Sequence, residues 1–172
     1  MSSHLDIIRT AIDSTSGEIW ECGVYSGDTA HWMAGHAPLR TLRLFDTFSG
    51  MPISGPHDSH KVGVMWVDEQ AVRARFTGFP NTSFHPGIIP VTFSGFEAAQ
   101  VGVTNIDVDQ YDSVKACLEF IYPRMEKGGY IILDDYNCPD CPGAKLATDE
   151  FMVGKPERLV KDGDCQPYLI KT

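Results

Sequence analysis

Two predicted strands, each leading into aspartates, constrain the fold of this chain more than any other feature. Residues 103–108 (VTNIDV) lead into Asp109, and the wholly apolar run 130–133 (YIIL) leads into an aspartate pair. Between them, residues 111–125 carry apolar side chains at helical spacing. A strand, a helix and a second strand in this order form the unit from which parallel sheets are built. The pattern therefore predicts a mostly parallel sheet covered by helices on both faces.

The rest of the chain continues this alternation. Strands are expected at 18–24, 41–48 and 82–84, the last followed by a turn at 85–87. Helices are expected at 5–12, with Ser2 or Ser3 as the cap, and at 29–36, 67–76, 93–100 and 144–152. The KGG sequence at 127–129 is expected to end the preceding helix, and 158–160 and 168–170 to form a terminal hairpin about a turn at 162–164. We expect one doubly wound α/β domain over residues 1–172.

Size and charge exclude several classes of protein. A chain of 172 residues is long enough for one well-buried domain. Its net charge of −9 repels phosphate backbones, so nucleic acid is not an expected partner. No stretch approaches the ~20 apolar residues that a membrane span requires, and the N-terminus lacks the apolar core of a signal peptide. We therefore expect a cytoplasmic protein without a membrane partner.

Four aspartates lie at the ends of these two predicted strands or directly after them: Asp107, Asp109, Asp134 and Asp135. Neighbouring parallel strands lie about 5 Å apart, so these carboxylates are expected to converge. Close carboxylates repel one another unless protons or a cation neutralise them. A single aspartate at a strand end is commonly a turn residue, but two doublets on successive buried strands favour a site. A hard divalent cation such as Mg²⁺ is the expected occupant.

A glycine-containing turn follows the first predicted strand. Residues 21–27 (ECGVYSG) include Gly23 and Gly27, which permit a tight turn and close approach to a ligand. This signal is weak alone and does not match the G-x-G-x-x-G pattern of dinucleotide sites. Asp46 ends the second predicted strand, where an acid commonly binds ribose hydroxyls. A turn or capping role for Asp46 fits the sequence equally well.

Several motifs together resemble the macrocin-type O-methyltransferases, which modify sugars of macrolide and aminocoumarin antibiotics. Residues 106–113 (IDVDQYDS) are similar to the D-x-D-x-Y-[ED]-S motif of that family. Further similarities lie at 21–24 (ECGV), 44–48 (LFDTF), 50–52 (GMP), 122–123 (YP), 127–130 (KGGY), 134–136 (DDY) and 149–151 (DEF). These motifs span most of the chain in the family's order.

The resemblance implies a class I methyltransferase fold, with a seven-stranded sheet whose last strand is antiparallel. It implies S-adenosylmethionine as cofactor, with Glu21 and Gly23 near its methionine part and Asp46 on its ribose. The full set of candidate cofactor residues is Glu21, Gly23, Tyr25, Ser26, Gly27, Asp46, Thr47 and Asp107. Asp107, Asp134 and Asp135 resemble the family's ligands for Mg²⁺ or another divalent cation, and Asp109 its proposed general base.

The expected function is S-adenosylmethionine-dependent and divalent-metal-dependent O-methylation of a small-molecule hydroxyl, on a sugar or a phenol. Family enzymes carry extra N-terminal helices, whereas few residues precede the first predicted strand here, so the chain resembles a minimal core. The Gly- and Pro-rich stretch 49–64 is expected to be a mobile lid. A homodimer is one option for the assembly.

Three alternatives remain open at this point. One is a catechol-type O-methyltransferase that uses the same fold and ion. Another is a regulatory module that binds S-adenosylmethionine or a nucleotide without catalysis, although such a module does not need four aspartates. An NAD-type oxidoreductase is weakened by the missing glycine pattern.

Cysteine and histidine residues give weaker signals. Cys138 and Cys141 form a C-x-x-C pair without a second ligand pair, and we interpret them as reduced loop thiols. The histidines at 31, 36, 57, 60 and 85 are interpreted as surface or lid residues. His57 and His60 are the two best placed to reach an acceptor.

Overall fold

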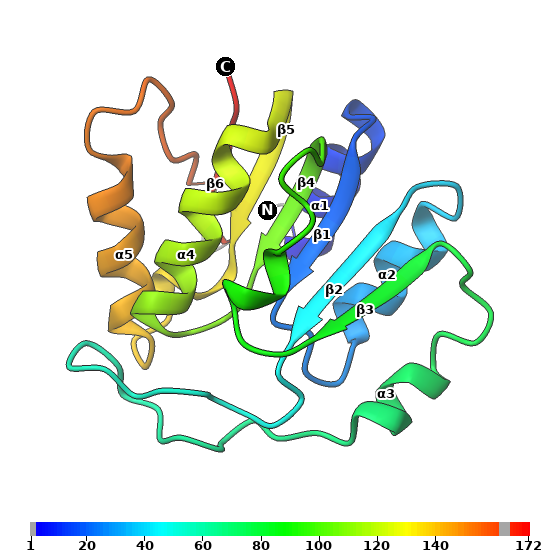
Figure 1. Ribbon diagram of the computed structural model, residues 1–172. Helices are drawn as coiled ribbons and strands as arrows, with labels where there is room; N and C mark the ends of the chain where they lie inside the picture. Colours follow the sequence, from blue (N-terminus) through cyan, green and yellow to red (C-terminus); the bar gives the residue numbers. More distant parts are fainter. Residues whose placement is uncertain (1–2, 162–165) are drawn as a thin grey trace.

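Six strands form one sheet in the part of the chain that the computed structural model describes, residues 3–161 and 166–172. Their spatial order is β3-β2-β1-β4-β5-β6, so the order reverses between β1 and β4 (Figure 1). Strands β1 to β5 run parallel, and β6 pairs antiparallel with β5. The bounds are β1 Glu18–Cys22, β2 Leu42–Asp46, β3 Thr82–Pro86, β4 Val101–Ile106, β5 Met125–Leu133 and β6 Tyr168–Ile170. The predicted doubly wound, mostly parallel fold is confirmed.

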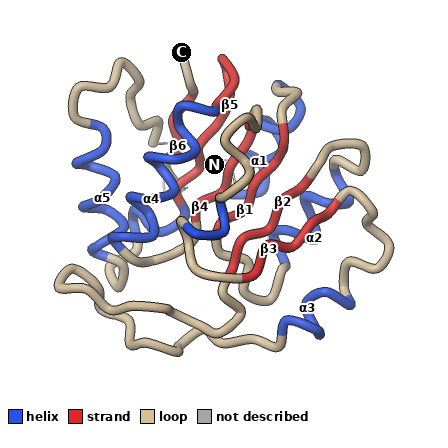
Figure 2. The backbone as a smooth tube through the Cα atoms, in the orientation of Figure 1, coloured by secondary structure: helices blue, strands red, loops and turns tan. Residues whose placement is uncertain are grey.

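Helices cover both faces of this sheet, with α1 and α2 on one face and α4 and α5 on the other (Figure 2). The bounds are α1 His4–Ser14, α2 Asp28–His36, α3 Glu69–Ala74, α4 Tyr111–Ile121 and α5 Pro142–Met152. Helix α1 begins with a capping box, in which the Ser3 hydroxyl accepts from the Asp6 N–H and the Asp6 carboxylate accepts from the Ser3 N–H. None of the described helices is both long and apolar enough to cross a membrane.

The two faces have separate cores because successive strand side chains point to opposite sides of a sheet. Ile19 and Leu44 belong to the core beneath α1 and α2. Trp20 and Phe45 belong to the core beneath α4 and α5, where their ring centroids lie 4.9 Å apart. Burial on both faces explains why the strands read as continuous apolar runs, and it fixes the sheet as a rigid support.

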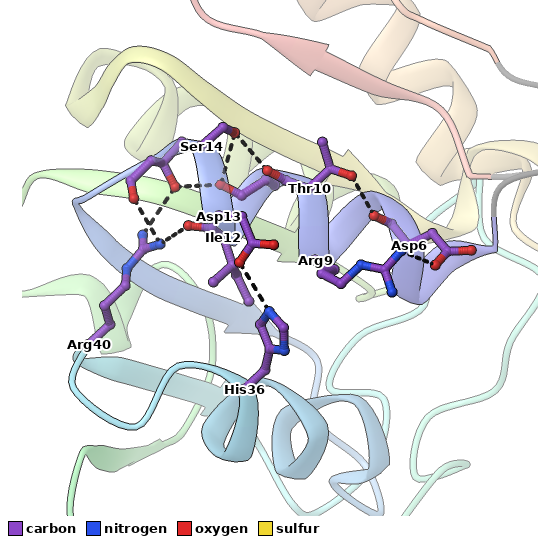
Figure 3. A network of polar contacts seen from close by, with 10 residues as sticks. Asp6, Arg9, Thr10, Ile12, Asp13, Ser14, His36 and Arg40 are labelled. Carbon is purple, nitrogen blue, oxygen red and sulfur yellow. Dashed lines mark hydrogen bonds and ion pairs between the residues drawn. The ribbon is translucent and has the colours of Figure 1, made fainter.

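One arginine ties the end of α1 to the start of the sheet (Figure 3). The Arg40 guanidinium donates from Nη1 to the Ile12 carbonyl at 2.7 Å and from Nε to the Gly17 carbonyl at 2.9 Å. It therefore satisfies backbone oxygens that the C-terminal end of α1 and the following turn leave unpaired. The contact between His36 Nε2 and Asp13 Oδ1, 3.2 Å long, joins α2 to α1 at the same place.

Two predicted helices differ from the structure. The helix expected at 93–100 is wrong, because only Val91–Phe93 forms a 3₁₀ turn and Gly95 then adopts a positive φ of 92°. Helix α4 ends at Ile121 and passes into a 3₁₀ turn, since Pro123 cannot continue the α-helical hydrogen bonds. The KGG sequence at 127–129 therefore does not end that helix, but lies inside β5 at an irregularity in its pairing with β4.

The predicted sheet also needs correction. The described residues contain six strands rather than seven. His85 and Pro86 belong to β3 and not to a turn. Of the expected terminal hairpin, the antiparallel bridge between Val160 and Tyr168 is present, whereas its turn at 162–164 lies outside the described residues, as do Ser2 and Cys165.

Candidate functional site

The register of the sheet brings the candidate residues to one edge. Cys22 of β1 pairs with Ile106 of β4, and Ile106 pairs with Leu133 of β5. The next residue on each strand therefore leaves the sheet at the same level, which places Gly23, Asp107 and Asp134 side by side. This edge lies where the strand order reverses, the usual ligand position in open α/β sheets.

Gly23 is required by the packing of the backbone. Its φ is +86°, and a Cβ atom there would lie 1.6 Å from the Asp107 carbonyl oxygen. Only glycine permits the end of β1 to approach the end of β4 this closely. The sequence predicted that Gly23 lets the backbone approach a ligand, and in the structure Gly23 lets the end of β1 approach the end of β4.

Asp46 organises the turn after β1 from the end of β2. Its Oδ2 accepts the Val24 and Tyr25 N–H groups at 2.6 and 2.9 Å, and its Oδ1 accepts the Phe48 N–H at 2.7 Å. Three charge-assisted hydrogen bonds hold the carboxylate in place. Asp46 thus has the turn role that the sequence allowed, and it also faces the cavity described next.

A cavity opens at the ends of β1, β2 and β4. It is lined by five of the candidate cofactor residues, by the candidate base and by apolar side chains that include Met51, Met65, Ile89 and Val108. The five cofactor candidates are Gly23, Tyr25, Asp46, Thr47 and Asp107, and the base candidate is Asp109. An apolar pocket with a few converging polar groups is typical of a small-molecule site.

Three cofactor candidates lie outside this lining. Glu21 is buried beneath it, where Asn105 Nδ2 approaches its Oε1 at 3.4 Å and no described residue bonds its Oε2. Burial raises the pKa of Glu21 well above its ordinary range. The Ser26 hydroxyl donates to Asp28, and Gly27, with a φ of +80°, begins α2 against Phe76. These two residues hold the turn rather than face the cavity.

Three carboxylates gather beside the cavity. Ligand oxygens of Asp107, Asp134 and Asp135 all lie within 4.8 Å of one another. Burial, and then the charges of Asp135 and Asp134, raise the pKa of Asp107 well above its ordinary range. Burial also raises the pKa of Asp134, and it raises that of Asp135 to about 7. Three of the four aspartates that were predicted to converge therefore lie in one group, whereas Asp109 is not part of it. The mutual repulsion of the three carboxylates favours a cation.

Asp109 is held in an unusual backbone conformation next to this cluster. Its φ is +57°, which is uncommon for a residue with a side chain. Its N–H donates to Asp135 Oδ2 at 2.8 Å, and the Cys141 thiol donates to its Oδ1 at 3.0 Å. The candidate base is therefore connected directly to one of the candidate metal ligands.

The loop between β2 and α3 reaches across the strand ends toward α4 and α5 (Figure 1). Asp58 attaches it there, because its Oδ1 accepts the Tyr111 N–H at the start of α4 at 2.8 Å. The same loop brings His60 next to Asp109 and Cys141. The sequence placed His60 in the predicted lid, within reach of an acceptor, but did not indicate its position next to Asp109 and Cys141, since nothing in the sequence reveals where a long loop attaches.

His4 is a residue of the site that the sequence did not indicate. Its Nδ1 lies 3.5 Å from Asp134 Oδ1. Burial lowers the pKa of His4, while the Asp134 charge and a contact with Gln166 oppose that shift. Because α1 packs beneath the sheet, only the tertiary structure shows that its first residue reaches the end of β5.

Comparisons with known proteins give a consistent result. Residues 3–156 match the family described as Macrocin-O-methyltransferase (TylF). A tetracenomycin 4'-O-methyltransferase of Streptomyces olivaceus is 32% identical over 151 residues, covering 77% of this chain and 58% of that protein. Demethyldecarbamoylnovobiocin O-methyltransferase of Streptomyces niveus is 29% identical over 171 residues, covering 86% and 64%. The solved O-methyltransferase NovP superposes with a TM-score of 0.84 at 27% identity, covering 98% of this chain and 79% of NovP. The chain thus spans about three-fifths of the length of these two curated relatives.

Proposed function

Because the chain belongs to the macrocin-O-methyltransferase family, we propose that it transfers a methyl group from S-adenosylmethionine to a hydroxyl of a small molecule, a sugar or a phenol. The observation that carries the proposal is the placement of Asp109 and Asp107 on the wall of a cavity at the ends of β1, β2 and β4. A methyl donor in this cavity would lie directly beside the carboxylates.

Methyl transfer requires little more than alignment and removal of one proton. The acceptor oxygen forms a bond to the methyl carbon, while the sulfur–methyl bond breaks and leaves its electron pair on sulfur. The hydroxyl proton passes to a base, for which we propose the Asp109 carboxylate. Asp109 suits this role because its backbone and its Oδ1 are both fixed, by Asp135 and Cys141. Alignment of the two reactants in the cavity would supply most of the acceleration.

The donor set at Asp107, Asp134 and Asp135 fits a hard divalent cation such as Mg²⁺. Three carboxylates that lie within 4.8 Å of one another, with raised pKa values, are costly to keep together without positive charge. We propose that these three side chains hold the ion. When bound, the ion would lower the pKa of an acceptor hydroxyl and offset the carboxylate charge.

The residues that we propose to bind the cofactor are chosen by their position relative to this cavity. We propose that Gly23, Tyr25, Asp46 and Thr47 contact S-adenosylmethionine directly, with Asp46 keeping its three backbone hydrogen bonds as it accepts from the ribose. Glu21 is proposed to act from beneath the cavity, since its Oε2 is buried and no described residue bonds it. Ser26 and Gly27 would act only by holding the turn.

Release of S-adenosylhomocysteine tests the proposal. The purified chain is incubated with S-adenosylmethionine and Mg²⁺ against panels of sugar and phenolic hydroxyl acceptors. Release that depends on one acceptor class supports the proposal and identifies that class. Tight binding of S-adenosylhomocysteine without turnover on any acceptor would favour a non-catalytic binding module instead.

The Asp109→Asn variant tests the proposed base. Asparagine preserves the shape of the side chain but cannot take a proton at neutral pH, so turnover should fall by roughly 10²–10⁴-fold. Affinity for S-adenosylhomocysteine, measured by calorimetry, should stay within a few-fold. Glu119→Gln, an exposed change on α4 outside the motif, is the control. Unchanged turnover in Asp109→Asn would exclude this mechanism.

A further inference from the structure

A second group of metal-ligating side chains lies next to the carboxylate cluster and differs from it in chemistry. His60, Asp109 and Cys141 each offer one ligand atom, and these three atoms all lie within 4.8 Å of one another. We propose that these residues form a separate binding site for a soft or borderline divalent cation, with Zn²⁺ as the natural occupant. Imidazole nitrogen, carboxylate oxygen and thiolate sulfur are the three ligand types that Zn²⁺ uses in proteins.

A further thiol lies beside this group and could supply a fourth ligand. Cys138 Sγ lies 3.1 Å from Cys141 Sγ, and both thiols are free. This separation lies between the length of a disulfide bond, about 2.05 Å, and the roughly 3.8 Å that separates two sulfur ligands of one tetrahedral zinc ion. A small rotation of Cys138 would complete a four-coordinate set. On binding, the two thiol protons would be released to solvent as the sulfurs become thiolates.

Three separate segments supply this site, and hydrogen bonds hold them together. Asp109 follows β4, the two cysteines precede α5, and His60 belongs to the loop between β2 and α3. Asp58 fixes that loop two residues before His60, by accepting the Tyr111 N–H at 2.8 Å and the Gly55 N–H at 2.9 Å. These contacts bring His60 to Asp109 and Cys141 when the loop lies against the start of α4.

The two candidate ion sites offer different ligand atoms and should therefore bind different ions. Asp107, Asp134 and Asp135 offer oxygen alone, which suits Mg²⁺, whereas Cys141 and His60 favour softer ions. Asp109 belongs to the softer set only. If Asp109 is the base, as proposed above, an ion held by its carboxylate would prevent proton transfer, so Zn²⁺ should inhibit the enzyme. Only this consequence depends on the proposed function.

Cobalt(II) serves as a spectroscopic probe, because thiolate ligation gives it an intense charge-transfer band and tetrahedral geometry gives it strong visible bands. The reduced protein is titrated with Co²⁺ alone, and Zn²⁺ is then added as a competitor. We expect one equivalent of Co²⁺ to produce both bands and Zn²⁺ to displace it. Neither reading requires methyl transfer, so a failed activity assay would leave this test intact.

Variants assign the bands to residues. His60→Gln and Cys141→Ser should each weaken Co²⁺ binding by roughly tenfold or more, since even outer partners of a metal site cost that much. His57→Gln, in the same loop but outside the cluster, is the matched control and should leave the affinity unchanged. Asp134→Asn removes a ligand of the oxygen site and should keep the thiolate band. Circular dichroism checks that each variant is folded.

Two results would overturn the proposal. One is the absence of a thiolate-to-cobalt band in the wild-type protein under reducing conditions. The other is a band that survives His60→Gln with unchanged affinity, because binding would then involve the cysteines without the cluster.

Discussion

Asp109, the proposed base, is linked to a proposed metal ligand through its own backbone N–H. A residue with a side chain at a φ of +57° is strained, at a cost of order 1–3 kcal/mol, and such strain persists only where other contacts enforce it. Here the Asp109 N–H bonds the Asp135 carboxylate, so the conformation that orients the proposed base depends on a proposed metal ligand. Neutralising or moving Asp135 would therefore disturb both functions.

At this scale the first prediction concerns Asp134. Replacing it by alanine removes one of three converging carboxylates, so the remaining pair should bind Mg²⁺ much more weakly. Metal-dependent turnover should be lost, while affinity for S-adenosylhomocysteine stays within a few-fold because Asp134 does not line the cofactor cavity. Turnover with and without EDTA, together with calorimetry, measures both effects.

Asp140→Ala is the control for that experiment, since Asp140 is exposed on the same segment. It should behave like the wild type. Full-rate methylation by the wild-type enzyme in excess EDTA would show that no ion is needed, and the proposed role of the three aspartates would be wrong.

Among the elements, the loop between β2 and α3 has few contacts with the core. It has no helix or strand of its own. Three backbone hydrogen bonds join its two arms: Met51 N–H to Val64 O at 2.9 Å, Gly63 N–H to Met51 O at 3.0 Å and Val67 N–H to Phe48 O at 3.4 Å. Its side chains at Ile53, Val62 and Trp66 are mostly exposed. Segments with few core contacts open at low free-energy cost.

We therefore expect residues 49–64 to exchange amide hydrogens quickly in the free protein and slowly when cofactor product and acceptor are both bound. Ligands in the cavity would contact Met51 and Met65 and so stabilise the closed loop. Hydrogen exchange followed by mass spectrometry measures the difference, with α4 as an internal reference. Equal protection in both states would exclude a lid.

Glu157, in the segment after α5, forms hydrogen bonds with Tyr122 and with two residues that follow β6, Lys171 and Thr172. Burial alone would raise the pKa of Glu157, but hydrogen bonds from the Tyr122 hydroxyl, the Thr172 N–H and Lys171 outweigh it and lower that pKa from 4.5 to about 2. A carboxyl whose pKa is lower in the folded state stabilises the fold above its unfolded pKa. That contribution is lost as the pH falls from about 4.5 toward 2.

Glu157→Gln should accordingly reduce the free energy of unfolding by about 1–3 kcal/mol at neutral pH, the usual effect of losing hydrogen bonds to a buried charge. The difference from the wild type should shrink below pH 4.5. Urea denaturation at pH 7 and in this acidic range measures both values, with the exposed Glu119→Gln as control. A difference that does not change with pH would contradict the role of the charge.

The sequence predicted elements well where local chemistry decides them. The apolar runs of β4 and β5 could be recognised because both faces are buried, and the aspartates at their ends converge because parallel strands end at one edge. The prediction of a helix at 93–100 was wrong because Gly95 interrupts the segment. Phe93 is apolar because it packs in the core beneath α4 and α5, and not because it belongs to an amphipathic helix. Nothing in the sequence indicated that His4 lies beside Asp134 or that His60 lies beside Asp109 and Cys141, since these positions depend on how α1 packs and where a loop attaches.

The whole molecule is a rigid sheet between two cores, with its site built almost entirely on one edge. Separate cores under α1–α2 and α4–α5 fix the strands, and the carboxyl ends of β1, β2, β4 and β5 supply the cavity and the carboxylates. Ligand binding should therefore stabilise the folded chain as a unit, because the cavity exists only when β1, β2 and β4 are in register.

This reasoning gives the last prediction, which separates the proposed cofactor from NAD. A ligand that binds only the folded state stabilises it by about 2.7 kcal/mol when present at 100 times its dissociation constant. For a chain of this size that corresponds to a rise in melting temperature of roughly 5–10 °C. We expect S-adenosylhomocysteine to produce such a rise and NAD to produce none, because Asp46 and Tyr25 shape a short turn without the three-glycine pattern of NAD sites. Thermal unfolding measures the melting temperature with each ligand, and titration calorimetry measures the affinity. Micromolar binding of NAD without binding of S-adenosylhomocysteine would show that the cofactor assignment is wrong.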